Sequence, residues 1–589
     1  MRMLDSGRTP LEHGQKRAAL GPLDGPACRP SEDVKFRLGL APEAGLIALA
    51  ATVFLFHLGT YGLWPDEARY AEIAREMLAG GGLVVPHLNY VAYVEKPPLL
   101  YWVTALSFRC FGINEFAARL PSAVFAMLGV LAVYVVGRRV FDRRRALLAG
   151  AILTTSPLYA MMAQVLTTDM MLTALVTIAL FALFLSGRED GICSWLAYGA
   201  IGLGVLTKGL VALALPLLSV SVFLWWEGEL REGGKRLRPL IGLVFAAFLS
   251  AWWFILVAVR QPGFLKFYFF GEHLRRFLDP TYSHGGPFYY YLPVLAAGML
   301  PWPLVAAVLF PSRPRRSPNS AWTFCAVAAC VTVVFYSAAQ SKLAPYILPA
   351  LPPLALIAAD LIVSCAAQRE PLSAAQAAAR SMSLVSLALM VAGVAAIALA
   401  LTAAEFANPY LILVRPSLTW LGLILFFGGA ASAGALARGR AAAGLAALVV
   451  SVALALMAAS YGRIETEPMR SFAAFSREVA ARAGDAQIVC YGRYVHAMPF
   501  YTHRRVVLIG PLSELRFGAE RAPDASSYFF SSDAALLKLW RQQRPVVVVI
   551  DQSELQRLKP ALGAFRIVAR ARDKLAVMHA DDARSKNPA

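Results

Sequence analysis

The chain has 589 residues, of which 58% are hydrophobic and only 16% are charged, and this composition excludes an ordinary soluble protein. The apolar residues form continuous runs of roughly 17–25 residues, which predicts a polytopic helical membrane protein and excludes an alternating, porin-like barrel. The net charge of +19 fits basic cytoplasmic loops beside anionic membrane lipids better than it fits nucleic acid, so no nucleic-acid partner is expected.

The N-terminal segment, residues 1–43, is largely polar and basic, and it has no early apolar core or cleavage site. We predict a poorly ordered cytoplasmic leader rather than a removable signal peptide. The membrane domain is predicted over residues 44–462. It begins with the span Leu46–Leu63, which runs outward if Lys35 and Arg37 stay inside.

The segment after the first span, from Trp64 to Trp102, is unusually charged for a chain of this composition. Its charged residues include Asp66, Glu67, Arg69, Glu95 and Lys96. An unpaired charge at a membrane boundary is costly and usually functional. We therefore expect this segment to form part of the functional site.

The predicted topology depends on the run Leu99–Phe111, which could cross the membrane or lie along its surface. The run is short for a span and contains Arg109, so we predict a surface helix. The next span, Leu120–Val136, then carries the arginine cluster of residues 138–145 to the cytoplasm, as the positive-inside bias requires.

About thirteen spans are predicted in total, which places the N-terminus inside and the C-terminal segment outside. The spans after the second are Leu147–Val165, Met170–Leu185, Ser194–Leu206, Leu210–Trp226, Leu240–Val259, Tyr289–Phe310, Trp322–Ala339, Pro345–Val363, Leu384–Leu401, Leu418–Leu436 and Leu445–Tyr461. The basic loops at residues 231–238, 313–316 and 438–440 all fall inside under this arrangement.

Residues 463–589 differ in composition and predict a soluble α/β domain on the outer, periplasmic side. The pattern of Pro468–Arg482 is typical of an amphipathic helix. Short β-branched runs predict strands at Ile488–Tyr491, Val506–Ile509, Val546–Ile550 and Leu575–His579. We assign His496 and His503 to the surface or core of this domain rather than to catalysis.

Four charged groups that are distant in sequence fall on the outer side under this topology. They are the loop from Asp66 to Lys96, Asp169 after Thr168, the loop Gly263–Pro287, and Lys342 with Tyr346. Cations beside a membrane suit a phosphate headgroup, and carboxylates close to them suit a general base or a metal ligand. Together the groups predict a reaction on a lipid-linked phosphate.

Each group alone has a simpler explanation. The negative charge of Asp66 at the start of a helix interacts favourably with the helix dipole. Lys96 before two prolines could anchor the chain at the interface, and Glu272 with His273 could be solvated loop residues. Only their shared placement on one face of the membrane favours a functional interpretation.

Several motifs carry a resemblance to a known family. They are Asp66-Glu67-Ala68-Arg69-Tyr70, Pro86-His87-Leu88-Asn89, Glu95-Lys96-Pro97-Pro98-Leu99, Arg119-Leu120-Pro121, Thr168-Asp169, Thr207-Lys208-Gly209, Glu272-His273 with Arg276, Pro287-Phe288-Tyr289, and Ser341-Lys342 with Tyr346. In these the chain resembles the bacterial lipid A aminoarabinose transferase family. That family lies within the protein O-mannosyltransferase-like, GT-C class of polyprenyl-phosphate-dependent glycosyltransferases.

The resemblance implies a mostly α, polytopic GT-C enzyme of the bacterial inner membrane. Such an enzyme moves a sugar, here a candidate 4-amino-4-deoxy-L-arabinose, from undecaprenyl phosphate to a periplasmic acceptor such as lipid A, with inversion. It implies catalytic carboxylates at Asp66 and Asp169. The donor phosphate is expected to bind to Arg69, Lys96, Arg276, Lys342 and Tyr346, with Arg275 as an open alternative to Arg276. Glu95, Asp66 and His273 are candidate ligands for a divalent metal ion, zinc or magnesium.

Three other functions stay open at this point. A protein O-mannosyltransferase-like enzyme would use a protein hydroxyl as acceptor and would need a general base. A lipid-linked sugar flippase or transporter would more often show inverted repeats and charges at mid-span, which this sequence lacks. A scaffold that only presents the C-terminal domain would not need the outer charges.

Overall fold

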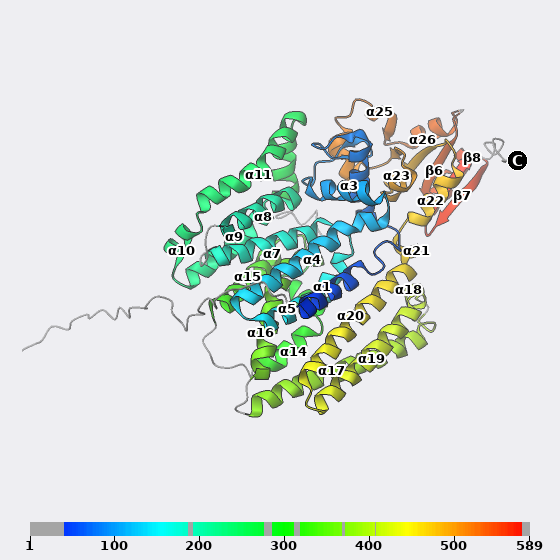
Figure 1. Ribbon diagram of the computed structural model, residues 1–589. Helices are drawn as coiled ribbons and strands as arrows, with labels where there is room; N and C mark the ends of the chain where they lie inside the picture. Colours follow the sequence, from blue (N-terminus) through cyan, green and yellow to red (C-terminus); the bar gives the residue numbers. More distant parts are fainter. Residues whose placement is uncertain are drawn as a thin grey trace, which may run out of the picture.

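The computed structural model describes residues 40–186, 192–275, 285–310, 319–367, 372–406, 408–542 and 544–579. A large bundle of helices forms the main body, and a sheet domain from the C-terminal part of the chain lies at one end of it (Figure 1). The predicted combination of a mostly helical membrane domain with a C-terminal α/β domain is confirmed.

Within the described residues, eight helices are long and apolar enough to cross a membrane, or ten spans if each of two bent helix pairs counts as one. The eight are α4 (Glu115–Val140), α7 (Thr168–Ser186), α11 (Pro239–Arg260), α15 (Ser320–Ala338), η5 with α16 (Ala344–Cys365), the Met382–Thr402 part of α17 (Leu372–Thr402), α19 (Arg415–Ala437) and α20 (Ala441–Glu465). The chain is therefore a multi-pass membrane protein.

The two bent pairs break where the sequence places proline. Helix α5 (Arg143–Thr154) meets α6 (Pro157–Ala163) at 67°, and α13 (Tyr291–Gly298) meets α14 (Trp302–Leu309) at 101°. Pro157 opens α6, and Pro301 directly precedes α14. Proline lacks the backbone donor and restricts the residue before it, so a continuous helix is not maintained at either place.

Three predicted spans coincide with shorter apolar helices, namely α1 (Leu40–Leu55), α8 (Ile192–Lys208) and α9 (Val211–Trp226). The count of thirteen membrane crossings therefore stays a prediction. The first helix is also shorter than the predicted Leu46–Leu63, and the backbone turns directly after it, where His57 has a left-handed conformation with φ of 55°. Helix α3 (Leu99–Phe111) has 13 residues and lies beside the sheet domain in Figure 1; its position on the membrane surface stays a prediction.

The C-terminal domain is built on a six-stranded sheet in the order β5-β4-β3-β6-β8-β7. Its strands are β3 (Gln487–Tyr491), β4 (Val507–Ile509), β5 (Phe529–Phe530), β6 (Val546–Asp551), β7 (Phe565–Ala571) and β8 (Lys574–His579). The first four strands in the sheet order pair in parallel, and β8 and β7 are antiparallel. Central strands β3 and β6 are buried on both faces, which explains their continuous β-branched sequences.

All four predicted strands are present, whereas β5 and β7 were not predicted. Strand β5 has only two residues. In β7, three residues are exposed, namely Arg566, Ile567 and Arg570, so its sequence has no continuous apolar run. The predicted amphipathic helix begins later than expected, at Ala473 rather than Pro468. Pro468 instead belongs to a separate turn, α21 (Glu467–Arg470), and extended backbone at Ser471 separates it from α22 (Ala473–Arg482).

The sheet domain is docked on the loop that follows α1. The side chain of Asn89 donates to the carbonyl of Val506 and accepts from its amide, both at 2.9 Å. The Leu63 amide donates to the Tyr501 hydroxyl at 2.9 Å, and the Ser471 hydroxyl donates to the Leu63 carbonyl at 2.8 Å. These paired polar contacts fix the domain against the charged loop identified from the sequence.

Candidate active site

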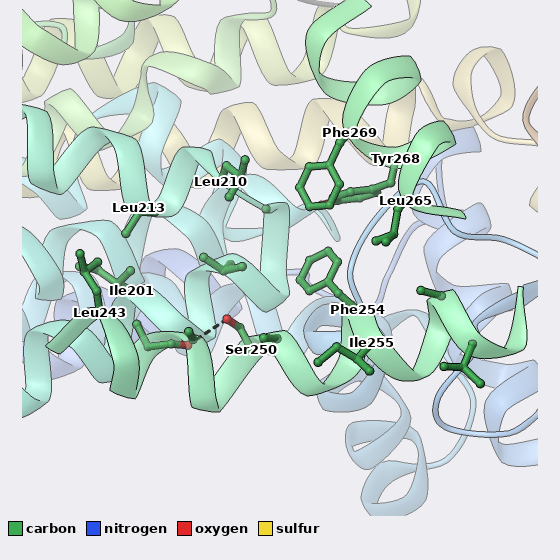
Figure 2. A pocket seen from close by; sticks show the side chains of 17 residues that line it. Ile201, Leu210, Leu213, Leu243, Ser250, Phe254, Ile255, Leu265, Tyr268 and Phe269 are labelled. Carbon is green, nitrogen blue, oxygen red and sulfur yellow. Dashed lines mark hydrogen bonds between the residues drawn. The ribbon is translucent and has the colours of Figure 1, made fainter. Parts of the chain in front are cut away.

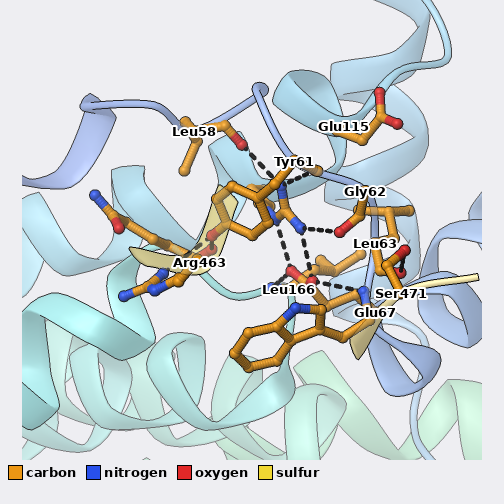
Figure 3. Close-up of polar contacts among 12 residues, drawn as sticks. Leu58, Tyr61, Gly62, Leu63, Glu67, Glu115, Leu166, Arg463 and Ser471 are labelled. Carbon is orange, nitrogen blue, oxygen red and sulfur yellow. Dashed lines mark hydrogen bonds and ion pairs between the residues drawn. The ribbon is translucent and has the colours of Figure 1, made fainter. Parts of the chain in front are cut away.

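A buried ion pair holds the loop between α1 and α2 (Pro65–Glu76) against the bundle. Arg119, on α4, donates to both carboxylate oxygens of Glu67 at 2.8 Å (Figure 3). It also donates to the backbone carbonyls of Leu58, Tyr61 and Gly62, at 2.9–3.1 Å. The two charged side chains are 0% and 1% exposed. The Arg119 and Glu67 pair therefore has a structural role.

Glu67 also joins the two segments that carry the predicted catalytic carboxylates. Its Oε1 accepts from the Leu166 amide, and its Oε2 accepts from the Trp64 amide, both at 3.0 Å. Leu166 lies just before α7, whose first turn contains Asp169, and Trp64 is the N-cap of the helix that contains Asp66. One buried carboxylate thus fixes both segments.

Asp66 faces outward although its neighbour Glu67 is buried. Successive residues of a helix point about 100° apart, so adjacent carboxylates can have opposite surroundings. The side chain of Asp66 is 72% exposed, and it accepts a hydrogen bond of 2.8 Å from Arg69, which is 18% exposed. The Asp66 carboxylate is therefore accessible from outside the chain.

The second predicted carboxylate, Asp169, is ion-paired with Lys208 at the end of α8. Both side chains are largely buried, at 14% and 13% exposure. The Lys208 ammonium also lies 4.2 Å from the centroid of the Tyr346 ring, a cation–π contact. The structure thus brings two predicted site residues, Asp169 and Tyr346, together through a lysine to which the sequence analysis gave no role.

Tyr70, buried on α2, lies within range of the charges of both carboxylates. Burial raises the pKa of its hydroxyl. The charges of Arg69 and Lys208 lower that pKa, whereas the charges of Asp66 and Asp169 raise it further. Because charge effects weaken with distance, all four groups lie close enough to Tyr70 to act on its hydroxyl.

Glu95 and Lys96 follow a small hairpin formed by β1 (His87–Leu88) and β2 (Val91–Ala92). Glu95 is 8% exposed and accepts a hydrogen bond of 3.1 Å from the Tyr93 hydroxyl. Lys96 is partly buried. Glu95 and Arg69 line the same cavity, so the two ends of the charged loop lie close together.

This cavity has a volume of about 810 Å³ and lies between the membrane domain and the sheet domain. Besides Arg69 and Glu95, its lining is Gly263, Lys266, Phe267, Phe270, Gly271, Ser513, Glu514, Arg516, Phe517, Glu520 and Arg521. About half of these residues come from the C-terminal domain. The contribution of this domain to the cavity was not predicted, because its charges lie far in sequence from any apolar span.

A second, apolar groove of about 740 Å³ runs between α8, α9 and α11 (Figure 2). Leu213, Leu243 and Phe254 are among its lining residues, and the Ser250 hydroxyl is already bonded to a helix carbonyl at 2.9 Å. Its lining includes Gly209, the residue after Lys208. The groove therefore offers a surface for hydrocarbon, and one of its lining residues is the chain neighbour of the Lys208 that pairs with Asp169.

Lys342 is buried and donates a hydrogen bond of 2.6 Å to the carbonyl of Ala339, at the end of α15. This contact alone is a helix-terminus interaction. The side chains of His273 and Arg275, in η2 (Lys266–Arg275), and the whole of Arg276 lie outside the described residues.

A metal site is not assembled from the residues that the structure describes. Asp66 pairs with Arg69, and Glu95 accepts from Tyr93. Across the described ranges, no three His, Cys, Asp or Glu side chains are grouped so that they could hold a metal ion. The divalent metal stays an expectation.

Two family models match the chain. Residues 95–255 match the model described as Dolichyl-phosphate-mannose-protein mannosyltransferase. Residues 476–579 match the model described as Aminoarabinose transferase C-terminal domain. The first match begins near the end of the charged segment and runs from α3 through most of α11, and the second covers most of the sheet domain.

Among curated proteins, the chain is 36% identical over 317 residues to the undecaprenyl phosphate-alpha-4-amino-4-deoxy-L-arabinose arabinosyl transferase of Erwinia tasmaniensis, over 52% of this chain and 57% of the relative. It is 37% identical over 338 residues to the protein of the same name from Pectobacterium carotovorum, over 54% of this chain and 60% of the relative. The chain thus spans a little over half the length of the curated relatives it matches.

Among solved structures, the chain is similar to ArnT from Cupriavidus metallidurans bound to undecaprenyl phosphate, with a TM-score of 0.81 and 26% identity over 94% of this chain and all of that one. Its apo form gives a TM-score of 0.79. The fold is therefore that of a polytopic membrane protein of the GT-C class. Within that class, the chain is similar to aminoarabinose transferases in sequence, in fold and in its C-terminal domain, in line with the resemblance of its motifs.

Proposed function

We propose that this chain transfers 4-amino-4-deoxy-L-arabinose from undecaprenyl phosphate to lipid A at the periplasmic face of the bacterial inner membrane. The observation that carries the proposal is the combination of a hydrocarbon groove with charged groups nearby: the groove is lined by Gly209, the residue that follows Lys208, and Lys208 is ion-paired with Asp169. A polyprenyl phosphate has the same two parts, an apolar chain and a charged head. The names of the curated relatives support the sugar and its carrier.

In this proposal the polyprenyl chain lies in the apolar groove and its phosphate faces the cations. Arg69 supplies a planar set of donors, and Lys96 supplies a compact charge. The resemblance assigns Arg276, Lys342 and Tyr346 to the same phosphate. The sugar then extends toward the cavity lined by Arg69 and Glu95.

The reaction is a single displacement. An acceptor oxygen attacks the anomeric carbon from the face opposite the phosphate, the bond from that carbon to the phosphate oxygen breaks, and undecaprenyl phosphate leaves with the electron pair. The cations stabilise the charge on the leaving phosphate. One displacement inverts the anomeric carbon.

Asp66 is the residue that faces the acceptor. A lipid A phosphate oxygen is already anionic and needs little base catalysis, so Asp66 would orient the acceptor or stabilise positive charge that develops on the sugar ring. Its exposure of 72% leaves room for a second large substrate. Asp169, held by Lys208, completes the acidic wall of the site.

The orientation of the chain is part of the proposal. The basic loops place the N-terminal segment in the cytoplasm and the C-terminal domain in the periplasm. The charged loop and the sheet domain then face the compartment in which lipid A receives its sugar.

A second acceptor class has one observation in its favour. The family model that matches residues 95–255 is described by protein mannosyl transfer, which uses a protein hydroxyl. With such an acceptor, Asp66 would have to accept the hydroxyl proton.

The test is transfer by the purified full chain in lipid nanodiscs, with radiolabelled undecaprenyl-phosphate aminoarabinose as donor. Lipid A, a serine- and threonine-containing peptide, or no acceptor is added. We expect label in lipid A, and no transfer by Asp66→Asn at equal expression. Label in the peptide would support the hydroxyl acceptor. In proteoliposomes, donor that crosses the bilayer without transfer would support a flippase, and a fully active Asp66→Asn variant would refute the role of Asp66.

A further inference from the structure

The C-terminal domain forms a fixed wall of the cavity. Its segment η6 (Ser513–Leu515) and α24 (Arg516–Ala519) packs directly on β2. A Cβ atom at Gly518 would lie 2.3 Å from the carbonyl oxygen of Ala92, so the backbone of α24 is in direct contact with the backbone of β2 at this point. The rings of Phe517 and Phe267 lie 4.9 Å apart and close the adjacent side. This wall is therefore held in a defined position relative to the charged loop.

Glu514 is a partly buried anion on this wall. Its side chain is 16% exposed, and its Oε1 accepts a hydrogen bond from Nε2 of His496 in the same domain. Burial by itself would raise the pKa of Glu514, but His496 and the nearby charge of Arg69 lower it to about 2. The carboxylate is thus ionised at any physiological pH, and Arg69 is close enough to act on it.

The surroundings of Glu514 contain more cations than anions. Arg69, Lys266, Arg516 and Arg521 line the same cavity, together with the carboxylates Glu95 and Glu520. A site for phosphate alone would not need a fixed, ionised carboxylate beside these groups, because a like-charged neighbour weakens anion binding. The simpler explanation, an ion pair that only stabilises the domain, does not account for its place on the cavity wall.

We propose that Glu514 binds the primary amine of the donor sugar and so selects an amino sugar. This inference rests on the proposed function. In 4-amino-4-deoxy-L-arabinose the anomeric carbon carries the phosphate, and the amine lies across the ring from it. A donor of this kind needs cations at one end of the site and an anion at the other. Arg69 from the membrane domain and Glu514 from the sheet domain line one cavity and provide that pair, and His496 orients the carboxylate.

The experiment measures donor selectivity without turnover. Full-length protein in nanodiscs is loaded with radiolabelled undecaprenyl phosphate, which is displaced by undecaprenyl-phosphate aminoarabinose or by its N-formyl derivative, which is uncharged at nitrogen. We expect wild type to prefer the amine roughly ten- to hundredfold, the range of one hydrogen bond between charged groups. Glu514→Gln should reduce the preference to about threefold or less, mainly by weakening binding of the amine.

The ratio of two ligands on one preparation is independent of the fraction of folded protein, so partial misfolding does not obscure the result. Glu554→Gln is the matched control, because Glu554 is an exposed carboxylate of the same domain that pairs with Arg557. It should keep the wild-type ratio. The inference is overturned if wild type shows no preference, or if Glu514→Gln keeps the wild-type preference. If wild type prefers the amine but does not transfer it to lipid A, the proposed function fails and the assignment of Glu514 stands.

Discussion

Neutralising Glu67 should lower the stability of the protein, whereas neutralising the adjacent Asp66 should abolish activity and leave stability unchanged. Glu67→Gln removes the charge that compensates buried Arg119, and it replaces an oxygen that accepts from a backbone amide. Loss of one partner from a buried pair costs about 3–5 kcal/mol. Asp66→Asn removes an exposed ion pair, worth about 0–1 kcal/mol.

The assay compares thermal unfolding and sugar transfer for the two variants in the same nanodiscs. Glu67→Gln should have a clearly lower unfolding temperature, and it should lose activity because Glu67 fixes the segments of both Asp66 and Asp169. Asp66→Asn should unfold like wild type and be inactive. A Glu67→Gln variant as stable as Asp66→Asn would refute the structural role given to the buried pair.

A further control separates the effect of the uncompensated Arg119 charge from the effect of the hydrogen bonds that Glu67 accepts. In the double variant Glu67→Leu with Arg119→Met, no uncompensated charge remains, and apolar replacement of buried ion pairs is often neutral or stabilising. We expect recovery of much of the unfolding temperature but not of transfer, because the hydrogen bonds to Leu166 and Trp64 are absent. Recovery of both would show that the bonds from Glu67 do not position the site.

Three more predictions follow from the site. Lys208→Met leaves the largely buried Asp169 without its partner, so the transfer rate should fall at least about tenfold while Lys208→Arg retains part of it; a wild-type rate in Lys208→Met would contradict this. Gly518→Val forces a side chain into Ala92, at a cost of about 1–3 kcal/mol, and should expose the C-terminal domain to limited proteolysis; unchanged protection would contradict the close packing. The pKa of Glu514 is lowered on folding from an ordinary 4.5 to about 2, so its stabilisation is present above pH 4.5 and is lost as pH falls toward 2. Wild type and Glu514→Gln should therefore differ in unfolding temperature at pH 6 and converge near pH 2.5, and a constant difference would contradict the assignment.

The sequence predicted the parts of the fold that depend on local patterns. Apolar runs marked the spans, and β-branched runs marked the buried strands β3, β4, β6 and β8. It missed β5 and β7, because a two-residue strand and a partly exposed edge strand have weak local patterns. It also placed the start of one helix at Pro468, because hydrophobic periodicity does not show where a chain becomes extended.

The site was predicted in part, and the misses have one physical cause. Asp66, Arg69, Glu95 and Asp169 were assigned from charge at a membrane boundary and from the family motifs. The contacts between distant segments could not be derived in the same way. Lys208 pairs with Asp169, which is 39 residues away in the sequence. Glu514 lines the cavity only because its domain packs against the β1–β2 hairpin.

Glu67 shows the same limit at shorter range. The sequence places it beside Asp66 with the same charge, yet one carboxylate is buried in a structural ion pair and the other is exposed. The signal that could have separated them is Arg119 in the family motif, an arginine at the start of an apolar span with no other obvious partner. Its pairing with Glu67 depends on the approach of α4 to α2, which no local sequence pattern shows.

The most direct test of the proposed activity is mass spectrometry of lipid A from a bacterial strain that lacks its own aminoarabinose transferase but still makes the lipid-linked donor. Expression of the wild-type chain should add the mass of one or more aminopentose residues to lipid A, and Asp66→Asn at equal abundance should add none. Unmodified lipid A in cells that contain both the donor and correctly inserted wild-type protein would contradict the proposal.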